Sequence, residues 1–275
     1  MSAVPSMPGT TDVPRAAPDS GSAAPAASAS GSAYVTSIAS TPELVRAAQR
    51  LRHRVFAEER GARLHTPVAG HDVDAFDETA DHLVVTDRTD GTVVGTYRLT
   101  PPGRTERLFS DGEFDLGGLP ADIRASMVEA GRACVHPDHR SGAVINAMWA
   151  GLARYVLLSG HRYLAGCASV PLAAAHGGAD ERAAVSAWLL ARGKHASPPG
   201  VRVLPHDPWL PAGPLEGTPR YADLPPLLRG YLRVGAWLCG PPAYERDFGD
   251  ADFFVLLDME RMNDRYRRYF LGEDR

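Results

Sequence analysis

The stretch MVEAGRACVHPDHRSGAV, residues 127–144, decides the fold. Residues 127–135 are mostly apolar or small and predict a buried strand, which His136-Pro137-Asp138 ends. A helix is predicted over residues 141–158, because apolar side chains recur there at three- and four-residue spacing. Residues 163–169 predict a second buried strand directly after that helix. A strand, a helix and a strand in succession are typical of an α/β (α+β) fold.

Three further elements are predicted upstream of this stretch. Residues 34–39 predict a short strand, and Ser40-Thr41-Pro42-Glu43 has the capping-box pattern that begins a helix. One apolar stripe continues that helix to about Glu58. Residues 81–87 and 92–99 predict a hairpin, since the Asp-Gly pair between them favours a tight turn.

Downstream, helices and strands continue to alternate. Helices are predicted over 181–191, 224–238 and, with a basic amphipathic pattern, 259–270; strands are predicted over 201–204 and 252–257. The intervening residues 194–220 are rich in Pro and Gly. Residues 34–275 are therefore expected to form a single α/β (α+β) domain.

The first 33 residues differ in composition from the rest. Ala, Ser, Pro and Gly make up 24 of them, so we predict a disordered tail that cannot bury a core. Pro and Ser interrupt every apolar run, which argues against a secretory signal.

The overall composition excludes several classes of function. A net charge of −4 gives no global positive field for nucleic acid. No apolar run reaches the roughly 20 residues of a transmembrane helix. Three widely spaced cysteines without CxxC spacing favour the reducing cytoplasm over a disulfide framework or a cysteine zinc site.

Four short motifs occur in order along the chain and resemble a known series. They are Leu51-Arg52-His53-Arg54-Val55-Phe56, Asp74-Ala75-Phe76-Asp77, Thr96-Tyr97-Arg98-Leu99 and Glu129-Ala130-Gly131-Arg132. The series is similar to that of the autoinducer synthases, which have a GNAT-like acyltransferase fold. The resemblance implies a mixed, mostly antiparallel twisted sheet flanked by helices. A closer resemblance, over residues 35–271, is to the L-ornithine N-acyltransferases of ornithine-lipid synthesis. It rests on residues 128–144 and on Gly166-Cys167-Ala168-Ser169, Leu224-Pro225-Pro226-Leu227-Leu228-Arg229-Gly230-Tyr231 and Ala251-Asp252-Phe253-Phe254.

N-acylation needs a base to free the attacking amine, and Glu129 is the candidate. In a regular strand Glu129 shares a face with Gly131 and Ala133, so an acid lies beside room for a substrate. Arg132, predicted as its catalytic partner, faces the other way unless the strand bulges. The competing interpretation is a structural ion pair of Glu129 with Arg132 or Arg98.

The predicted acyl-donor site consists of Val135, Arg140, Ser141 and Gly142, at the start of the helix. GNAT proteins bind the pyrophosphate of coenzyme A with a glycine-rich loop, but Ala143 and Ile145 replace two of those glycines here. Acyl-coenzyme A is therefore a less favoured donor than the acyl-phosphopantetheine arm of acyl carrier protein, which has one phosphodiester. Arg154 and Arg162 are weaker candidates for contact with the acidic carrier. The alternative for Arg140 is a solvated arginine.

Arg54, Arg98, Asp74 and Asp77 are the predicted acceptor-binding residues. A guanidinium suits the carboxylate of an amino acid, and a carboxylate suits its side-chain ammonium. Pairing of these four charges only with one another has equal weight. We predict no metal site: His53, His136 and His139 lack ligand spacing. Cys134 and Cys167 are expected to pack inertly in strands.

The resemblance implies a cytoplasmic N-acyltransferase, with peripheral contact at the inner face of the membrane as an option. It would transfer a long-chain fatty acyl group, with or without a 3-hydroxyl, from acyl carrier protein to the α-amine of L-ornithine or a similar amino acid. It would hold no bound cofactor. Two alternatives stay open: an autoinducer synthase, and a non-catalytic sensor that binds acyl carrier protein.

Overall fold

An open sheet forms the centre of the fold in the computed structural model, which describes residues 33–140, 142–173, 180–262 and 264–271. Ala33–Arg275 form one compact unit. Ala33 aside, the predicted tail lies outside the described residues, as does Ser141 of the predicted donor site.

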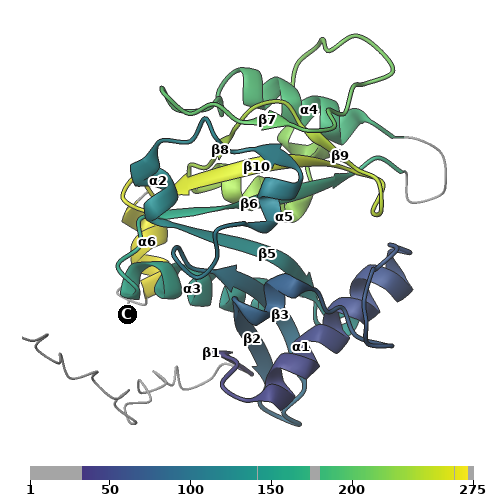
Figure 1. The fold of residues 1–275 in the computed structure, drawn as a ribbon, viewed down its shortest axis with the longest axis vertical. Coiled ribbons are helices and arrows are strands. Elements are labelled where there is room, and N and C mark those ends of the chain that lie inside the picture. The colour runs from purple at the N-terminus through teal and green to yellow at the C-terminus, as the bar shows by residue number, and fades with distance from the viewer. Residues whose placement is uncertain (1–32, 141, 174–179, 263, 272–275) are drawn as a thin grey trace, which may run out of the picture. The chain divides into compact units, whose positions relative to one another are not determined.

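The order of strands in the sheet is β1-β2-β3-β5-β6-β10-β8, with β9 also paired to β10. Their bounds are β1 Tyr34–Ile38, β2 Asp81–Asp87, β3 Val93–Thr100, β5 Met127–Val135, β6 Tyr163–Pro171, β8 Trp237–Leu238, β9 Ala243–Glu245 and β10 Asp250–Asp258. Among the strands that the structure describes, β5 and β6 form the only parallel pair. A two-stranded sheet joins β4 (Phe114–Asp115) and β7 (Leu204–Pro205). The predicted mixed, mostly antiparallel sheet is confirmed (Figure 1).

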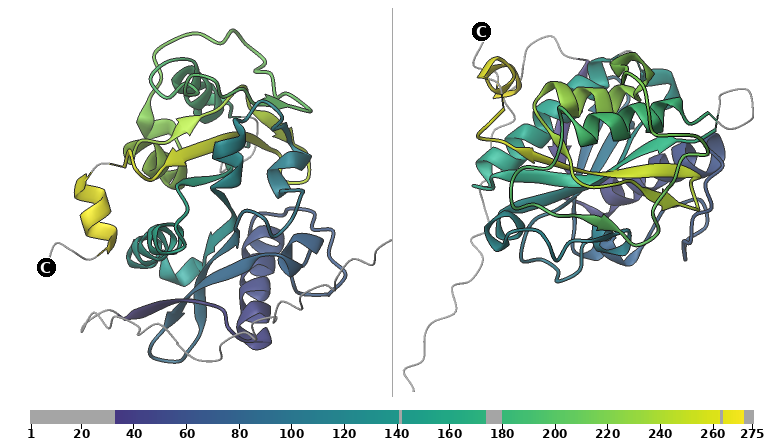
Figure 2. Two further views of the ribbon diagram at one scale, coloured as in Figure 1. Left: turned by 60° about the vertical axis from the view of Figure 1, so that its left-hand side comes forward. Right: turned by 90° about the horizontal axis from the view of Figure 1, so that it is seen from above.

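Helices cover both faces of the sheet (Figures 1 and 2). Their bounds are α1 Pro42–His53, α2 Ala121–Ala125, α3 Ala143–Leu158, α4 Arg182–Arg192, α5 Pro226–Arg233 and α6 Asp264–Leu271. Ala48 and Leu51 of α1 pack with Val84 of β2. Met148 of α3 packs with Leu83, the neighbour of Val84 on the same strand. Because successive strand residues point to opposite faces, α1 and α3 lie on opposite sides of the sheet.

Three predicted helices differ in the structure. The helix predicted to about Glu58 is α-helical only to His53 and continues as a π-helix over Arg54–Glu59. The helix predicted over 224–238 ends at Arg233, because Gly235 adopts a φ of +103° and residues 237–238 pair with β10 as strand β8. The helix predicted from 259 begins only at Asp264. Strand β7 covers residues 204–205 rather than 201–204, and β4, β9 and α2 were not predicted.

Strands β5 and β6 separate after a short shared segment. They pair only between residues 127–129 and 163–165. At the next residue of β6 a Cβ on Gly166 would lie 2.1 Å from the carbonyl oxygen of Ala130, so glycine is required for this close approach. Beyond it the two strands diverge (Figure 1). This divergence creates the space for a site in the middle of the sheet.

Candidate active site

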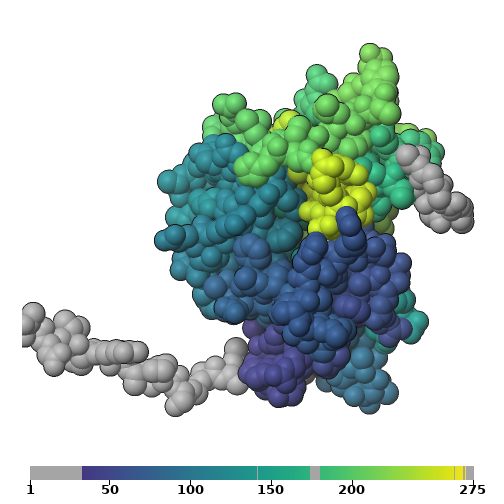
Figure 3. Space-filling model, turned by 45° about the vertical axis from the view of Figure 1, so that its right-hand side comes forward, coloured from purple at the N-terminus to yellow at the C-terminus, as the bar shows by residue number. Residues whose placement is uncertain are grey.

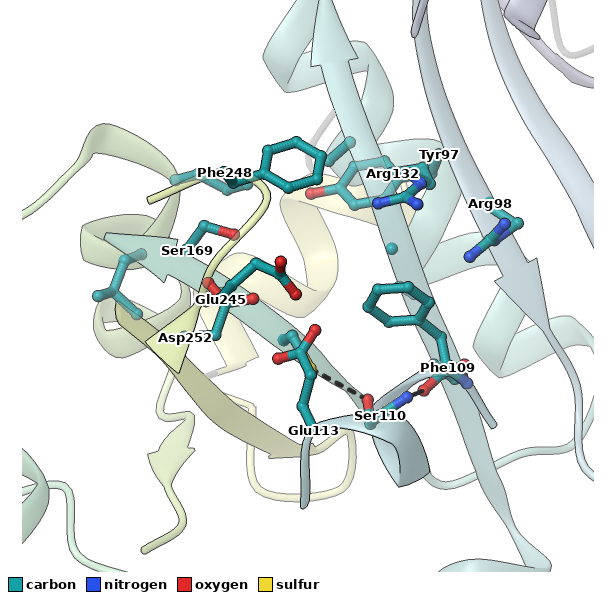
Figure 4. A pocket seen from close by; sticks show the side chains of 18 of the residues that line it. Tyr97, Arg98, Phe109, Ser110, Glu113, Arg132, Ser169, Glu245, Phe248 and Asp252 are labelled. Atoms are coloured by element: carbon teal, nitrogen blue, oxygen red, sulfur yellow. Dashed lines mark hydrogen bonds between the residues drawn. The ribbon is translucent and has the colours of Figure 1, made fainter. Parts of the chain in front are cut away.

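A pocket of about 170 Å³ lies beside the divergence of β5 and β6. Its wall includes polar residues from distant parts of the chain: Arg60, Tyr97, Arg98, Ser110, Glu113, Glu129, Arg132, Cys167, Ser169, Tyr231, Glu245 and Asp252. Figure 4 shows arginines on one side of this pocket and carboxylates on the other. In Figure 3 the yellow surface of the C-terminal part lies between the green and dark blue surfaces. Arg60 and Asp250, 2.6 Å apart, join the blue and yellow segments.

A β-bulge brings Arg132 to the pocket. The β3–β5 register changes between Thr96, opposite Cys134, and Arg98, opposite Gly131, so two residues of β5 face one of β3. Arg132 takes the extra position with a φ of +51°, which is uncommon for a residue with a side chain. Arg132 and Glu129 therefore both line the pocket. The sequence predicted Arg132 on the same face as Glu129 only if the strand bulges, and the bulge is present.

Glu129 is buried and binds backbone rather than an arginine. Its Oε2 accepts the N–H of Phe109 at 2.9 Å, and its Oε1 accepts the N–H of Ser110 at 2.8 Å. These amides open the short 3-10 helix Phe109–Gly112, whose orphan donors Glu129 satisfies. The sequence left open an ion pair of Glu129 with Arg132 or Arg98. Among the described residues, Glu129 forms no ion pair with either arginine. Each oxygen keeps a further lone pair that can accept a substrate proton.

Three arginines and three aspartates form a network beside the pocket. Arg52 pairs with Asp72 at 3.0 Å and Asp77 at 2.6 Å, and Arg98 pairs with Asp74 at 2.5 Å and Asp77 at 3.2 Å. Arg132 makes the longer contacts, 3.2 Å to Asp72 and 3.4 Å to Asp74. The charges balance, and Asp74 and Asp77 are occupied by arginines.

One of the four predicted acceptor-binding residues is absent from this network. Arg54, predicted to bind the acceptor, is exposed, lies 2.6 Å from Nε2 of His136 and does not line the pocket. Arg52 takes its place beside Asp77. Both arginines belong to the motif Leu51–Phe56. Arg52 is buried and Arg54 is exposed, so Arg52 joins the network.

The partners of the aspartates set their ionisation. Burial alone would raise the pKa of Asp74, but the charge of Arg98 and its hydrogen bond lower it below its ordinary value. The same balance between burial and Arg52 lowers the pKa of Asp77. Aromatic rings support the guanidinium groups: that of Arg132 lies 5.0 Å from the ring centre of Phe109 and 5.7 Å from that of Phe248.

The opposite side of the pocket is acidic, and the sequence analysis did not predict it. Glu113, Asp252 and Glu245 all line it. Burial and the nearby carboxylate Asp252 raise the pKa of Glu113, and burial with the charge of Asp250 raises that of Asp252. One signal was available, because Asp252 is an ionisable residue inside the otherwise apolar run ADFFVLL at residues 251–257, where an unpaired charge is costly.

A tyrosine pair and an apolar extension complete the site. The hydroxyls of Tyr97 and Tyr231 lie 2.6 Å apart in a hydrogen bond. Tyr231 also lines a smaller pocket between β5 and β6, of about 20 Å³, whose other walls are largely apolar. They are formed by Ala130, Leu164, Ala165, Gly166, Cys167, Ala168, Val255 and Leu257.

The described residues of the predicted donor site lie outside this pocket, at the start of α3. Arg140 holds Glu59 in a two-pronged contact of 2.5 and 2.7 Å, and also donates to the carbonyl of Val135. Gly142 is the residue before α3 and has a φ of +92°, which favours glycine. Arg140 is therefore paired rather than freely solvated.

Cys134 is buried, Cys167 is half-buried, and His136 and His139 contact other side chains. Burial raises the pKa of Cys134 to about 12 and that of Cys167 well above its ordinary value, so both disfavour the thiolate at neutral pH. His136 contacts Arg54, and His139 contacts the hydroxyl of Tyr34 at 3.0 Å.

Known proteins are similar to this chain in sequence or in fold. Residues 51–150 match the acetyltransferase (GNAT) domain family. An L-ornithine N(alpha)-acyltransferase of Rhodobacter capsulatus is 34% identical in an alignment 256 residues long, which covers 86% of this chain and 94% of that protein. One of Brucella abortus is 32% identical in an alignment 252 residues long, which covers 86% of this chain and 88% of that protein. The crystal structure of the AHL synthase LasI aligns with a TM-score of 0.53 at 14% identity, covering 88% of this chain and 96% of that one, and shows the shared fold.

The fold and these relatives define the class of protein: it is an acyltransferase of the GNAT type. More particularly, the chain belongs to the L-ornithine N-acyltransferase family. Among the described residues, none of the helices has the length and apolarity needed to cross a membrane.

Proposed function

We propose that this protein transfers a long-chain fatty acyl group, with or without a 3-hydroxyl, from acyl carrier protein to the α-amine of L-ornithine. The observation that carries the proposal is the pocket beside the β5–β6 divergence, where Glu129 and Arg132 of one strand face a space of about 170 Å³. A pocket of this size suits an amino acid rather than a protein substrate. The names of the relatives supply ornithine as the acceptor.

Arg132 is the proposed ligand for the acceptor carboxylate. Its side chain is 16% exposed, and its contacts to Asp72 and Asp74 are longer than those of Arg52 and Arg98. A carboxylate can therefore join its guanidinium group with the least loss of existing pairs. Arg98, Asp74 and Asp77 act as positioning residues that fix Arg132.

The reaction is a direct aminolysis of the thioester. Glu129 accepts a proton from the α-ammonium, and the freed amine attacks the thioester carbonyl carbon. The tetrahedral intermediate collapses and the carbon–sulfur bond breaks, so that the thiolate of the phosphopantetheine arm leaves. The nitrogen loses its second proton, and this proton converts the thiolate to the thiol. Reference α-amines have a pKa of about 8 and lysine side chains about 10.4, so the α-amine is the easier one to free. The products are an amide and a free thiol.

The donor enters from the side of α3 in this proposal. Val135, Arg140, Ser141 and Gly142 contact the single phosphodiester of the arm, and the apolar space between β5 and β6 receives the start of the acyl chain. Arg140 must then exchange part of its contact with Glu59 for the phosphate. The enzyme works at the cytoplasmic side of the membrane, where its lipid product is delivered.

The test combines purified full-length protein, long-chain acyl carrier protein and ornithine, with fragmentation of the product by mass spectrometry. We expect an acyl group on the α-nitrogen and release of one thiol per product. An acyl group on the side-chain nitrogen contradicts the proposed orientation. Equal kcat/KM with the matching acyl-coenzyme A contradicts the proposed donor.

A further inference from the structure

Three segments bring carboxyl groups together on the side of the pocket opposite Arg132. Glu113 follows the 3-10 helix Phe109–Gly112, Asp252 lies on β10, and Glu245 lies on β9. Side-chain atoms of Glu113, Asp252 and Cys167 all lie within 4.8 Å of one another. Figure 4 shows Glu113, Asp252 and Glu245 directed toward the same part of the pocket.

Asp252 has only part of the hydrogen bonding that a buried carboxylate needs, since Ser169 is hydrogen-bonded to its side chain. Asp252 is 3% exposed, and its Oδ1 has no hydrogen-bond partner among the described residues. Both carboxylate oxygens of Glu113 are also buried, and neither has a hydrogen-bond partner among the residues that the structure describes. Buried carboxyl groups are normally paired or hydrogen-bonded, so these two face a space that a ligand can fill.

The charge around this pair is unbalanced, in contrast to the arginine network. Arg52, Arg98 and Arg132 are matched by three aspartates. On the acidic side the lining cation is Arg60, which lies 2.6 Å from Asp250. Glu113 and Asp252 consequently favour a ligand that carries positive charge and donates hydrogen bonds, since such a ligand can replace the protons that their raised pKa values otherwise keep on them.

We propose that Glu113 and Asp252 bind the side-chain ammonium of a diamino-acid acceptor and thereby select it against amino acids with apolar side chains. An ammonium has three donors and no acceptor, which matches the free carboxylate oxygens. The proposal rests on the proposed acyltransferase function and completes it. With its carboxylate at Arg132 and its side-chain ammonium at Glu113 and Asp252, the acceptor presents its α-amine between the two ends. The site replaces Asp74 and Asp77, which the sequence favoured for this role.

The experiment compares ornithine with norvaline, which has the same carbon chain without the ammonium. Wild-type protein, Asp252→Asn and Glu113→Gln are assayed with long-chain acyl carrier protein, and ornithine binding is measured by calorimetry without a donor. Asp207→Asn is the matched control, since this carboxylate pairs with Arg246 outside the pocket. Both pocket variants are close in shape to the native residues, and circular dichroism checks their folding.

We expect each pocket variant to lower the ornithine-to-norvaline ratio of kcat/KM by about 10- to 100-fold, the value of one charge-assisted hydrogen bond. Ornithine binding should weaken by a similar factor, and Asp207→Asn should leave both unchanged. If the variants acylate ornithine with an unchanged ratio, the ammonium site is wrong while the acyltransferase function stands. If wild type acylates no amino acid but ornithine binding depends on Asp252, the proposed function is wrong and the site stands. Mg²⁺ or Zn²⁺ binding that Asp252→Asn abolishes, with ornithine binding unaffected, would make the cluster a metal site and overturn the proposal.

Discussion

Arg52 Nη2 lies 2.6 Å from Asp77 Oδ2, with both side chains almost completely buried. Arg54, two residues further along the chain, is exposed and contacts His136. The two arginines share one motif but not one role. Arg52 fixes the network behind Arg132, and this difference sets the first prediction.

Replacing Arg52 should destabilise the fold, and replacing Arg54 should not. Arg52→Ala leaves Asp72 and Asp77 buried without their main cation, which costs about 3–5 kcal/mol in the free energy of unfolding. Arg54→Ala should change it by only about 0.5 kcal/mol, as at other surface sites. Urea denaturation of both variants measures the difference. Equal losses would show that the buried network contributes little.

Glu129→Gln should lower the free energy of unfolding and slow acyl transfer, for two different reasons. The new amide NH₂ faces a backbone N–H of Phe109 or Ser110, which costs about 1–3 kcal/mol of stability. Loss of the base should slow acyl transfer by about 10²- to 10⁴-fold, with the rate recovering as pH rises and the amine deprotonates unaided.

Asp111→Asn is the control for Glu129→Gln. Asp111 accepts the N–H of Leu108 at 2.8 Å in the same turn but does not line the pocket. It should lose stability while retaining the wild-type pH profile. A Glu129→Gln variant that behaves in the same way would make Glu129 a positioning residue only.

Glu113 and Asp252 should make the free energy of unfolding decrease as pH rises. Burial raises the pKa of Glu113 and Asp252, so the folded protein holds protons that the unfolded chain releases above about pH 4. The unfolding free energy contributed by the pair is therefore greatest at low pH and is lost as pH rises. Cys167, Glu245, Asp250 and Arg60 also face this region.

Asp252→Asn should consequently be more stable than wild type, by about 1–3 kcal/mol at pH 8, with a smaller difference at pH 4. Thermal unfolding across this pH range checks the sign. A stability difference that does not change with pH would show that Asp252 has an ordinary pKa in the folded protein.

Arg140 should contribute to the use of acyl carrier protein. Arg140→Ala should lower kcat/KM for acyl carrier protein by about 3- to 10-fold at low salt, and this loss should shrink as salt screens the charge. Arg182→Ala is the control, because Arg182 is an exposed arginine that pairs with Asp180 at the start of α4 and has no predicted role in donor binding. The same loss in both variants would indicate a nonspecific charge effect.

Gly166 should be required where β5 and β6 meet. In Gly166→Ala the new Cβ would lie 2.1 Å from the carbonyl oxygen of Ala130, so the strands must move apart. We expect a loss of several kcal/mol, above the range of about 1–3 kcal/mol for ordinary overpacking. Gly213→Ala, which meets no atom within 4 Å, is the control in the same denaturation assay. Wild-type stability of Gly166→Ala would show that the strand contact is loose.

The sequence by itself determined the order of most elements and the class of chemistry. Apolar periodicity located α1, α3, β2, β3 and β5, because local spacing is enough to define an element that buries one face. The motif around Glu129 indicated an acyltransferase, since its residue types and order resemble a known series. The helix predicted over 224–238 was wrong at its end, where a long-range strand pairing and Gly235 override the local pattern.

Only the tertiary structure decided which charged residues meet. The bulge that turns Arg132 into the pocket depends on its register against β3, and the choice of Arg52 over Arg54 depends on which side of the helix faces the sheet. Glu113 and Asp252 are far apart in the sequence and become neighbours only when the 3-10 turn packs against β10. Local spacing carries no information about such contacts, because they form between segments that the sheet brings together.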